Sequence, residues 1–333
     1  MPRLPASADR AASGRAAAAT RLGFRHVRHM DGASRRGSWR ASRAVPRSVT
    51  RRLTGKLLSA RSDSAASFIP GNPDRVLVLA HGYPWPDDSR LDSDLIQYAR
   101  AAVSRWAAFA EAHRAIVVAP VFGGQEFPRY REMLGRTIRP DELVNLLVER
   151  AAREHIPHFA GRFSLHGHSA GAQFAARYLV THPERLDEVV LSAPSTFPMP
   201  DPRIPWPHGM ATARIHDDTG SRAGEAASGQ VNAEFTPAPI GWLTAASAVS
   251  VTVLAGSRDT EQRPPAPGQG GSTRIGRATA WVESMRRHAQ ASKRTATIRF
   301  VIAEGFDHDE EAMAVPAQEI LALRWQATAE SPD

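Results

Sequence analysis

The 333-residue sequence contains no cysteine and only two lysines, Lys56 and Lys293, beside 40 arginines. Without cysteine the protein cannot use a disulfide framework, a catalytic thiolate, a zinc site built on thiolates or a cysteine-ligated iron–sulfur cluster. No stretch of about 18 consecutive apolar residues occurs either, so we expect no transmembrane helix. Hydrophobic residues make up 42% of the sequence, which is enough for a large buried core.

Positive charge is concentrated at the N-terminal end of the chain. The whole sequence has a formal net charge of +8, which by itself would indicate a polyanionic partner. Residues 1–63 hold 15 basic and three acidic residues, a net charge of +12. The remaining 270 residues hold 27 basic and 31 acidic residues, a net charge of −4. We therefore expect no specific nucleic-acid partner for this larger part.

The segment 1–63 is rich in Ala, Arg and Ser and poor in large apolar residues. Such a composition cannot bury enough apolar surface to offset its chain entropy, so we predict a basic, disordered extension. Arg51 and Arg52 loosely match a twin-arginine export signal, but the run of about 7–15 apolar residues that export needs does not follow. We therefore expect a cytoplasmic protein. The excess of arginine over lysine indicates a GC-rich coding sequence, so we interpret the segment as an unselected extension whose start codon is assigned too far upstream. Non-specific adhesion of the segment to nucleic acid or an anionic membrane is the alternative that its charge allows.

From residue 75 onward, short apolar runs alternate with amphipathic segments. The run Arg-Val-Leu-Val-Leu-Ala at 75–80 is typical of a strand buried on both faces of a parallel sheet. A helix is predicted over 93–112, where apolar residues recur at helical spacing. This alternation predicts an α/β protein with a mainly parallel sheet and helices on both faces. Further strands are expected at 115–119, 162–166, 188–192, 251–255 and 297–301, and further helices at 140–152, 170–182, 277–291 and from 310 onward.

The stretch 195–247 interrupts this alternation. It is rich in Pro, Gly and Trp and has no clear strand pattern, which predicts a cap or lid inserted over the sheet. The folded domain is accordingly expected at 64–333, with the cap at about 195–247. Trp206 and Trp242 either line an apolar substrate pocket or anchor this cap.

The sequence Gly-His-Ser-Ala-Gly at 167–171 is a G-x-S-x-G motif between a predicted strand and a predicted helix. A sharp turn there lifts the hydroxyl of Ser169 clear of the sheet, and the helix N-terminus supplies positive potential and free N–H groups. A serine hydroxyl needs a base, ordinarily a histidine that is held by a carboxylate. His308 follows the last predicted strand and Asp259 follows the preceding one, so both are expected at the same sheet edge as Ser169.

Two other carboxylates and two other histidines compete for roles at this site. Asp307 and Asp309 flank His308, but immediate neighbours in a turn rarely reach back to the imidazole, so Asp259 is preferred. His81 and His168 also end strands near the expected site, where such residues usually support loops. No H-E-x-x-H spacing occurs, and we expect neither a metal nor another cofactor.

The chain order Ser169, Asp259, His308 in its strand–turn–helix setting resembles the α/β-hydrolase superfamily over about residues 70–327. The resemblance implies an α/β-hydrolase fold with Ser169 as nucleophile, His308 as base and then acid, and Asp259 as the orienting carboxylate. The serine disfavours epoxide hydrolases and dehalogenases, which are similar but place an aspartate at this position. The His-Gly-Tyr-Pro loop at 81–84, the long segment after Pro120 and the Gly-His-Ser-Ala-Gly turn are similar to those of polyhydroxyalkanoate-depolymerase-like and feruloyl-esterase-like proteins.

The same resemblance implies an oxyanion hole made of backbone N–H groups. One donor is expected from Ala170, the residue after the nucleophile, and the second from Tyr83 in the loop His-Gly-Tyr-Pro. Trp85, beside this loop, and His168 are expected to line the substrate pocket. We predict a serine hydrolase that cleaves a small-molecule carboxylic ester through an acyl-enzyme. An amidase or peptidase with the same triad, and a binding protein that retains the fold without turnover, are the alternatives.

Overall fold

The computed structural model describes residues 64–82, 92–123, 126–135, 137–215, 233–235 and 241–329, so the predicted extension 1–63 lies outside the described residues. Seven strands form one sheet in the order β1-β3-β2-β4-β5-β8-β9. β1 (Ala65–Phe68) pairs antiparallel with β3 (Ala115–Pro120), and every other neighbouring pair is parallel. The remaining strands are β2 (Arg75–Ala80), β4 (Phe163–His168), β5 (Leu186–Ser192), β8 (Ser250–Gly256) and β9 (Ile298–Ala303).

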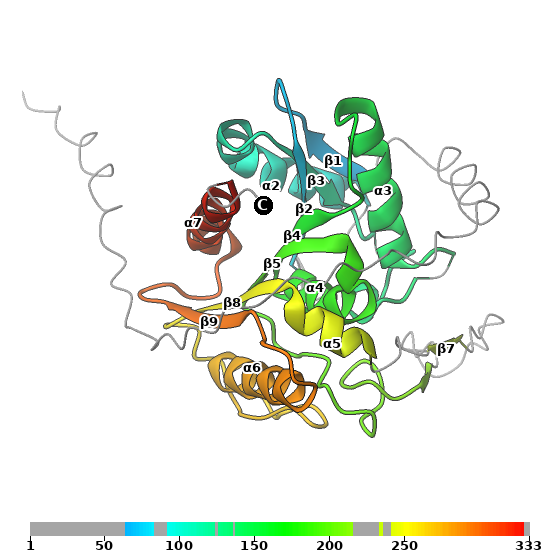
Figure 1. The fold of residues 1–333 in the computed structure, drawn as a ribbon, viewed down its shortest axis with the longest axis vertical. Coiled ribbons are helices and arrows are strands. Elements are labelled where there is room, and N and C mark those ends of the chain that lie inside the picture. Colours follow the sequence, from blue (N-terminus) through cyan, green and yellow to red (C-terminus); the bar gives the residue numbers. More distant parts are fainter. Residues whose placement is uncertain are drawn as a thin grey trace, which may run out of the picture. The chain divides into compact units, whose positions relative to one another are not determined.

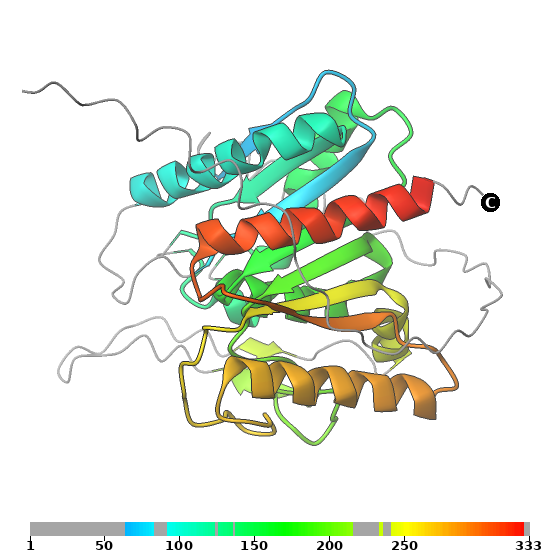
Figure 2. The ribbon, with the colours of Figure 1, turned by 90° about the vertical axis from the view of Figure 1, so that its left-hand side faces the viewer.

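Helices cover both faces of the sheet, which confirms the predicted α/β architecture (Figure 1). On one face lie α2 (Asp92–Ala112) and α7 (Glu310–Ala329), which run in front of the strands in Figure 2. The other face packs against the remaining four helices. These are α3 (Pro140–His155), α4 (Ala170–Thr181), α5 (Gly241–Ala248) and α6 (Arg274–Ala291), with two short 3₁₀ turns, η1 (Tyr130–Glu132) and η2 (Pro183–Arg185), on the connecting loops.

The strand β2 shows why the strands are continuous apolar runs. Val76 and Val78 point into the core beneath α3 and α4, whereas Leu77 and Leu79 point into the core beneath α2 and α7. All four side chains are buried. Because successive side chains of a strand point to opposite faces, a strand between two helical layers favours apolar residues at successive positions.

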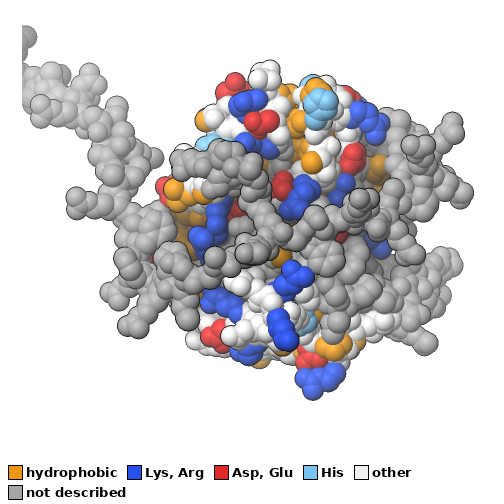
Figure 3. Space-filling model, in the orientation of Figure 1, with side chains coloured by type: hydrophobic (Ala, Val, Ile, Leu, Met, Phe, Trp, Pro, Cys, Tyr) orange, Lys and Arg blue, Asp and Glu red, His pale blue; other side chains and the backbone are white. Residues whose placement is uncertain are grey.

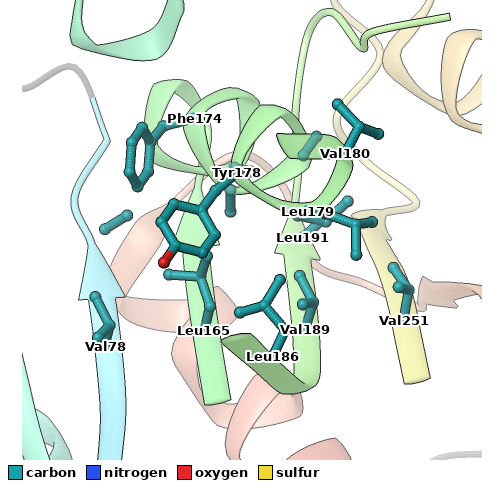
Figure 4. Packing of buried hydrophobic residues seen from close by; sticks show 14 of the residues in the cluster. Val78, Leu165, Phe174, Tyr178, Leu179, Val180, Leu186, Val189, Leu191 and Val251 are labelled. Atoms are coloured by element: carbon teal, nitrogen blue, oxygen red, sulfur yellow. The ribbon is translucent and has the colours of Figure 1, made fainter. Parts of the chain in front are cut away.

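The helix α4 lies at the centre of the packing, and every one of its residues is buried. Its Tyr178 lies over Leu165 of β4, Phe174 lies on the side of β2, and Leu179 lies over the neighbouring strand β5 (Figure 4). Tyr178 also donates a hydrogen bond from its hydroxyl to the side-chain oxygen of Asn145 on α3, at 2.6 Å. The helix is therefore fixed against two strands and a second helix, and so is the turn at its N-terminus.

The insertion predicted at 195–247 is described only in part. It contains a two-stranded antiparallel ribbon of β6 (Ala213–Ile215) and β7 (Ala233–Phe235), so the expectation that it lacks strands is wrong. Strands of three residues are too short to show a period-two pattern in sequence. Trp206 is buried and donates its indole N–H to the carbonyl of Glu132 at 2.8 Å, which favours the anchoring role for this residue. The side chain of Trp242 lies outside the described part.

A buried arginine connects this insertion to the central helix. Arg177 of α4 is 1% exposed and donates hydrogen bonds to the carbonyls of Pro207 and Arg131 and to the hydroxyl of Thr196, at 3.0–3.2 Å. The charge is thus solvated by backbone carbonyls and a hydroxyl instead of water. The first part of the insertion is consequently fixed to the element that carries the G-x-S-x-G turn.

Charges of both signs are interspersed over the described residues on the face that Figure 3 shows. The exposed large hydrophobic side chains of the described part are Ile69, Ile302, Val315 and Leu323. None of the helices in this part has both the length and the apolar character that crossing a bilayer requires.

Candidate active site

The G-x-S-x-G sequence forms a sharp turn between β4 and α4. Ser169 has φ 51° and ψ −110°, a conformation that is costly for a residue with a side chain. Two hydrogen bonds hold it: its N–H donates to the carbonyl of Ser192 at 2.8 Å, and its carbonyl accepts from the N–H of Gln173 at 3.1 Å. The turn therefore presents the Ser169 hydroxyl at the carboxyl end of β4, as the motif predicts.

Glycine is required on both sides of this serine. A Cβ on Gly171 would lie 2.0 Å from the carbonyl oxygen of Ala80 in the neighbouring strand β2. A Cβ on Gly167 would lie 2.3 Å from the carbonyl oxygen of Gly171. Both distances are far inside van der Waals contact, so the backbones can approach this closely only without side chains.

A chain of hydrogen bonds joins Ser169, His308 and Asp259. The Ser169 Oγ lies 2.9 Å from His308 Nε2, and His308 Nδ1 lies 2.8 Å from Asp259 Oδ2. An ionised carboxylate only accepts, so Nδ1 carries the proton and Nε2 is left as the acceptor for the serine hydroxyl. The structure thus brings together the three residues that the sequence selects, in the tautomer that a general base needs.

The two competing carboxylates are engaged elsewhere. The Asp307 carboxylate accepts the N–H of Asp309 at 2.9 Å, and the Asp309 carboxylate accepts the N–H of Ala312 in the first turn of α7 at 2.7 Å. Both stabilise their own loop and the start of the following helix. Asp259, which is 4% exposed, is the carboxylate that contacts the imidazole.

The loops after β8 and β9 hold each other in place. The N–H groups of Ser257 and Arg258 donate to the carbonyls of Ala303 and Phe306 at 3.0 and 2.8 Å. A Cβ on Gly256 would lie 2.4 Å from the Phe306 carbonyl, so the two loops also meet at a glycine. Asp259 and His308 are separated by 49 residues in the chain, but these bonds fix the distance between the loops that carry them.

Two buried histidines support the site from behind. His168 Nε2 donates to the carbonyl of His308 at 3.1 Å, and the ring is only 3% exposed. His81 accepts the N–H of Phe122 at Nε2 and donates from Nδ1 to the carbonyl of Gly82. Burial lowers the pKa of His81 to about 4 and that of His168 to about 3, so both rings are neutral at physiological pH. Each ring therefore fixes a loop, and a role for His168 toward substrate stays a prediction.

The end of β2 is attached to the start of α7. Glu310, two residues after His308, accepts hydrogen bonds from the N–H of Gly82, at 3.3 Å, and from the hydroxyl of Tyr98 on α2. Burial raises the pKa of the Glu310 carboxyl, although both hydrogen bonds act in the opposite direction. This contact was not predicted from the sequence, where only the closeness of Glu310 to His308 could have suggested it.

The structure describes only one of the two predicted oxyanion donors. Ala170 is the first residue of α4, so its N–H is not used by the helix and lies directly after the serine. Tyr83 and Trp85 lie outside the described residues, and their predicted roles stay predictions. In the described part of the chain, no group of three or more His, Asp or Glu side chains is placed to hold a metal ion.

A buried guanidinium completes the electrostatics of the site. Arg274 Nη1 donates to Asp259 Oδ1 at 2.6 Å, on the oxygen that His308 does not use. Burial alone would raise the pKa of the Asp259 carboxyl, but the hydrogen bond from His308 and the charge of Arg274 lower it below its ordinary value. Asp259 is therefore ionised at neutral pH. No sequence motif marks Arg274, because only the packing of α6 brings it here.

Comparison with known proteins gives a fold. No family model and no curated protein matches the sequence. Poly(aspartic acid) hydrolase-1 from Sphingomonas sp. KT-1 superposes with a TM-score of 0.59 and 18% identity, over 77% of this chain and 91% of that protein. LpqC, a poly(3-hydroxybutyrate) depolymerase from Bordetella parapertussis, superposes with a TM-score of 0.59 and 22% identity, over 77% and 82%. The chain has the α/β-hydrolase fold.

In this α/β-hydrolase fold, each of the three hydrogen-bonded residues lies just beyond the carboxyl end of a parallel strand: Ser169 after β4, Asp259 after β8 and His308 after β9. Ligands of open α/β sheets bind at this edge. The fold predicted from the sequence is confirmed, and the identities of 18% and 22% transfer no activity to this chain.

The turn at Ser169 gives a first test. We expect Gly171→Ala to lower the free energy of unfolding by at least about 2 kcal/mol, because its Cβ would overlap the backbone of β2. We also expect it to move the serine out of reach of His308. Urea unfolding and a hydrolase assay measure the two effects. Gly71→Ala is the matched control, since a Cβ there meets no atom within 4 Å. A Gly171→Ala protein with unchanged stability would contradict this account of the turn.

Proposed function

We propose that the protein is a serine hydrolase that cleaves carboxylic esters through an acyl-enzyme, with Ser169 as nucleophile, His308 as base and Asp259 as the orienting acid. The observation that carries this proposal is the hydrogen-bonded chain from Asp259 through His308 to Ser169. It lies at the N-terminus of a buried helix, where the potential favours a developing negative charge. The geometry fits nucleophile, base and orienter in a single arrangement.

The acylation step follows from the proton positions. His308 Nε2 accepts the hydroxyl proton while Ser169 Oγ bonds to the carbonyl carbon of the substrate, whose oxygen becomes an oxyanion. His308 then carries both ring protons, and the buried carboxylate of Asp259 stabilises the imidazolium that forms. When the carbon–oxygen bond to the leaving group breaks, His308 returns the proton from Nε2 to the departing alcohol. An acyl group remains on Ser169.

Deacylation uses the same base a second time. A water molecule takes the place of the alcohol, and His308 Nε2 removes one of its protons as the oxygen attacks the acyl carbon. The second tetrahedral intermediate collapses by releasing Ser169 Oγ, which receives the proton from His308. The products are the carboxylic acid and the regenerated enzyme.

The oxyanion needs hydrogen-bond donors that are in place before the reaction begins. We propose the backbone N–H of Ala170 as one donor and that of Tyr83 as the second. A single donor of this type typically contributes about 3 kcal/mol of transition-state stabilisation. Glu310 supports this arrangement, because it holds the N–H of Gly82 immediately before Tyr83 and follows His308 by two residues.

Among substrates with a carbonyl group, esters are the first that should be tested. One structural neighbour is a depolymerase of poly(3-hydroxybutyrate), which is a polyester. We propose that Trp85 and His168 contribute to the binding of a small-molecule ester. The same triad serves amide hydrolysis, so each p-nitrophenyl ester is to be compared with the p-nitroanilide of the same acid.

Replacement of the nucleophile tests the reaction class directly. We expect Ser169→Ala to lower kcat for p-nitrophenyl esters by about 10⁴-fold or more, because no covalent intermediate can form. Release of p-nitrophenol measures the rate. Ser67→Ala, on the exposed side of the edge strand β1, is the control and should retain full activity. Unchanged hydrolysis by Ser169→Ala would remove Ser169 from the mechanism.

Replacement of the carboxylates tests the choice of acid. We expect Asp259→Asn to lower kcat by about 10³- to 10⁴-fold, because an amide cannot hold the Nδ1–H tautomer or stabilise an imidazolium. Asp307→Asn should change kcat by less than about threefold, since the amide oxygen can still accept the N–H of Asp309. Steady-state kinetics on one ester suffice for both. A large loss in Asp307→Asn with little loss in Asp259→Asn would reassign the acid.

A further inference from the structure

Asp259 has two oxygens, and a different cationic or potentially cationic group occupies each of them. His308 takes Oδ2 at 2.8 Å, and Arg274 Nη1 takes Oδ1 at 2.6 Å. Arg274 is the first residue of α6, and its other terminal nitrogen, Nη2, donates to Glu261 at 2.5 Å. A single carboxylate therefore connects the imidazole to a fixed guanidinium.

The Arg274 guanidinium is held at some cost. Its side chain is only 5% exposed, and of its two acidic partners Glu261 is 42% exposed. Within the described part of the chain its Nε–H is buried and has no hydrogen-bond partner. A buried donor without a partner destabilises the fold, so stability alone does not favour an arginine here. Asp259, on which Arg274 acts, also contacts the proposed base.

The other charged groups around Asp259 and His308 can be separated from this one. On α6, Arg277 donates to the carbonyl of Ser272 and has no hydrogen bond to Asp259 among the described contacts. On β4, His168 stays neutral, because burial lowers its pKa to about 3. The remaining charged groups lie on the loops that carry the two residues and at the start of α7: the exposed Arg258 and Glu304, and Glu261, Arg263, Asp307, Asp309 and Glu310.

We infer that Arg274 is a positioning residue of the proposed triad: it fixes Asp259 toward His308 and sets, through its charge, the lowest pH at which His308 acts as a base. The inference rests on the proposed function. The charge of Arg274 partly cancels that of Asp259, so the site stabilises the imidazolium less than a lone buried aspartate would. Removal of the Arg274 charge should therefore strengthen the interaction between Asp259 and the imidazolium that forms during catalysis.

Neutral and charged substitutions at position 274 separate charge from packing. Arg274→Gln can still donate to Asp259 Oδ1 but has no charge, so the acid limb of kcat/KM against pH should move to higher pH by about one unit. Arg274→Lys keeps the charge but loses the planar guanidinium, whose two terminal nitrogens bind Asp259 and Glu261. We expect its acid limb within about 0.3 unit of the unmodified protein and its kcat several-fold lower.

The experiment measures kcat/KM on one p-nitrophenyl ester from pH 4.5 to 9 for the full-length protein and its variants. Arg263→Met is the matched control: Arg263 is 58% exposed and binds Glu261 but not Asp259, so its removal should leave the limb in place. Thermal unfolding shows which variants fold. In the unmodified protein, a buried pair resists screening, so the limb should move by less than about 0.3 unit between 0.05 and 0.5 M NaCl.

The outcomes distinguish this inference from the proposed function. An upward shift in Arg274→Gln alone supports the role of the charge. The inference is overturned if the acid limb does not move in folded Arg274→Gln, or if it moves equally in Arg274→Lys or Arg263→Met. It is also overturned if the acid limb of the unmodified protein moves with salt concentration. The salt series decides by itself if no variant folds. Absence of ester hydrolysis by the unmodified protein would instead overturn the proposed function.

Discussion

The sharp turn at Ser169 is the constraint on which the rest of the site depends. A residue with a side chain holds a positive φ there, and its N–H and carbonyl are both hydrogen-bonded, to Ser192 and Gln173. The two flanking glycines allow the backbones of β2, β4 and α4 to approach to distances that no Cβ tolerates. The buried packing of α4 on β4 and β5, seen in Figure 4, thus has a direct consequence for chemistry, because it fixes the turn that carries the Ser169 hydroxyl.

The partners of Ser169 are held by hydrogen bonds between loops. The loops after β8 and β9 bond to each other, His168 holds the backbone of His308, and Glu310 ties the end of β2 to the start of α7. Burial keeps the supporting histidines neutral, so they act only as fixed donors and acceptors. Asp259 and Arg274 form a buried ion pair, and the partly exposed His308 donates to the other oxygen of the same carboxylate.

The sequence predicts the central part of this structure because that part obeys simple periodicities. Fully buried strands are continuous apolar runs, and the predicted strands agree with β2 to β5, β8 and β9 to within a few residues. The short strands β1, β6 and β7 were missed, since three or four residues show no usable period. The helix expected from residue 277 begins at Arg274, because Thr273 caps it by accepting the N–H of Gly276.

Some residues of the site could be predicted from the sequence, and others could not. Ser169, Asp259 and His308 could be selected because each follows a strand and their chain order fits one fold. Arg274 and Glu310 could not, since their contacts depend on how α6 and α7 pack and no spacing marks them. The contact of His168 with the backbone of His308 could not be predicted either, because it depends on how the loop after β9 packs against the end of β4.

We expect the folded chain to contain one activated serine, and a fluorophosphonate probe tests this expectation most directly. Ser169 Oγ should attack the phosphorus and displace fluoride, leaving a stable phosphonate ester. Mass spectrometry of the digested full-length protein should find the adduct on the peptide that contains Ser169 and on no other serine. A folded protein that stays unlabelled, or an adduct on a different residue, would contradict the account.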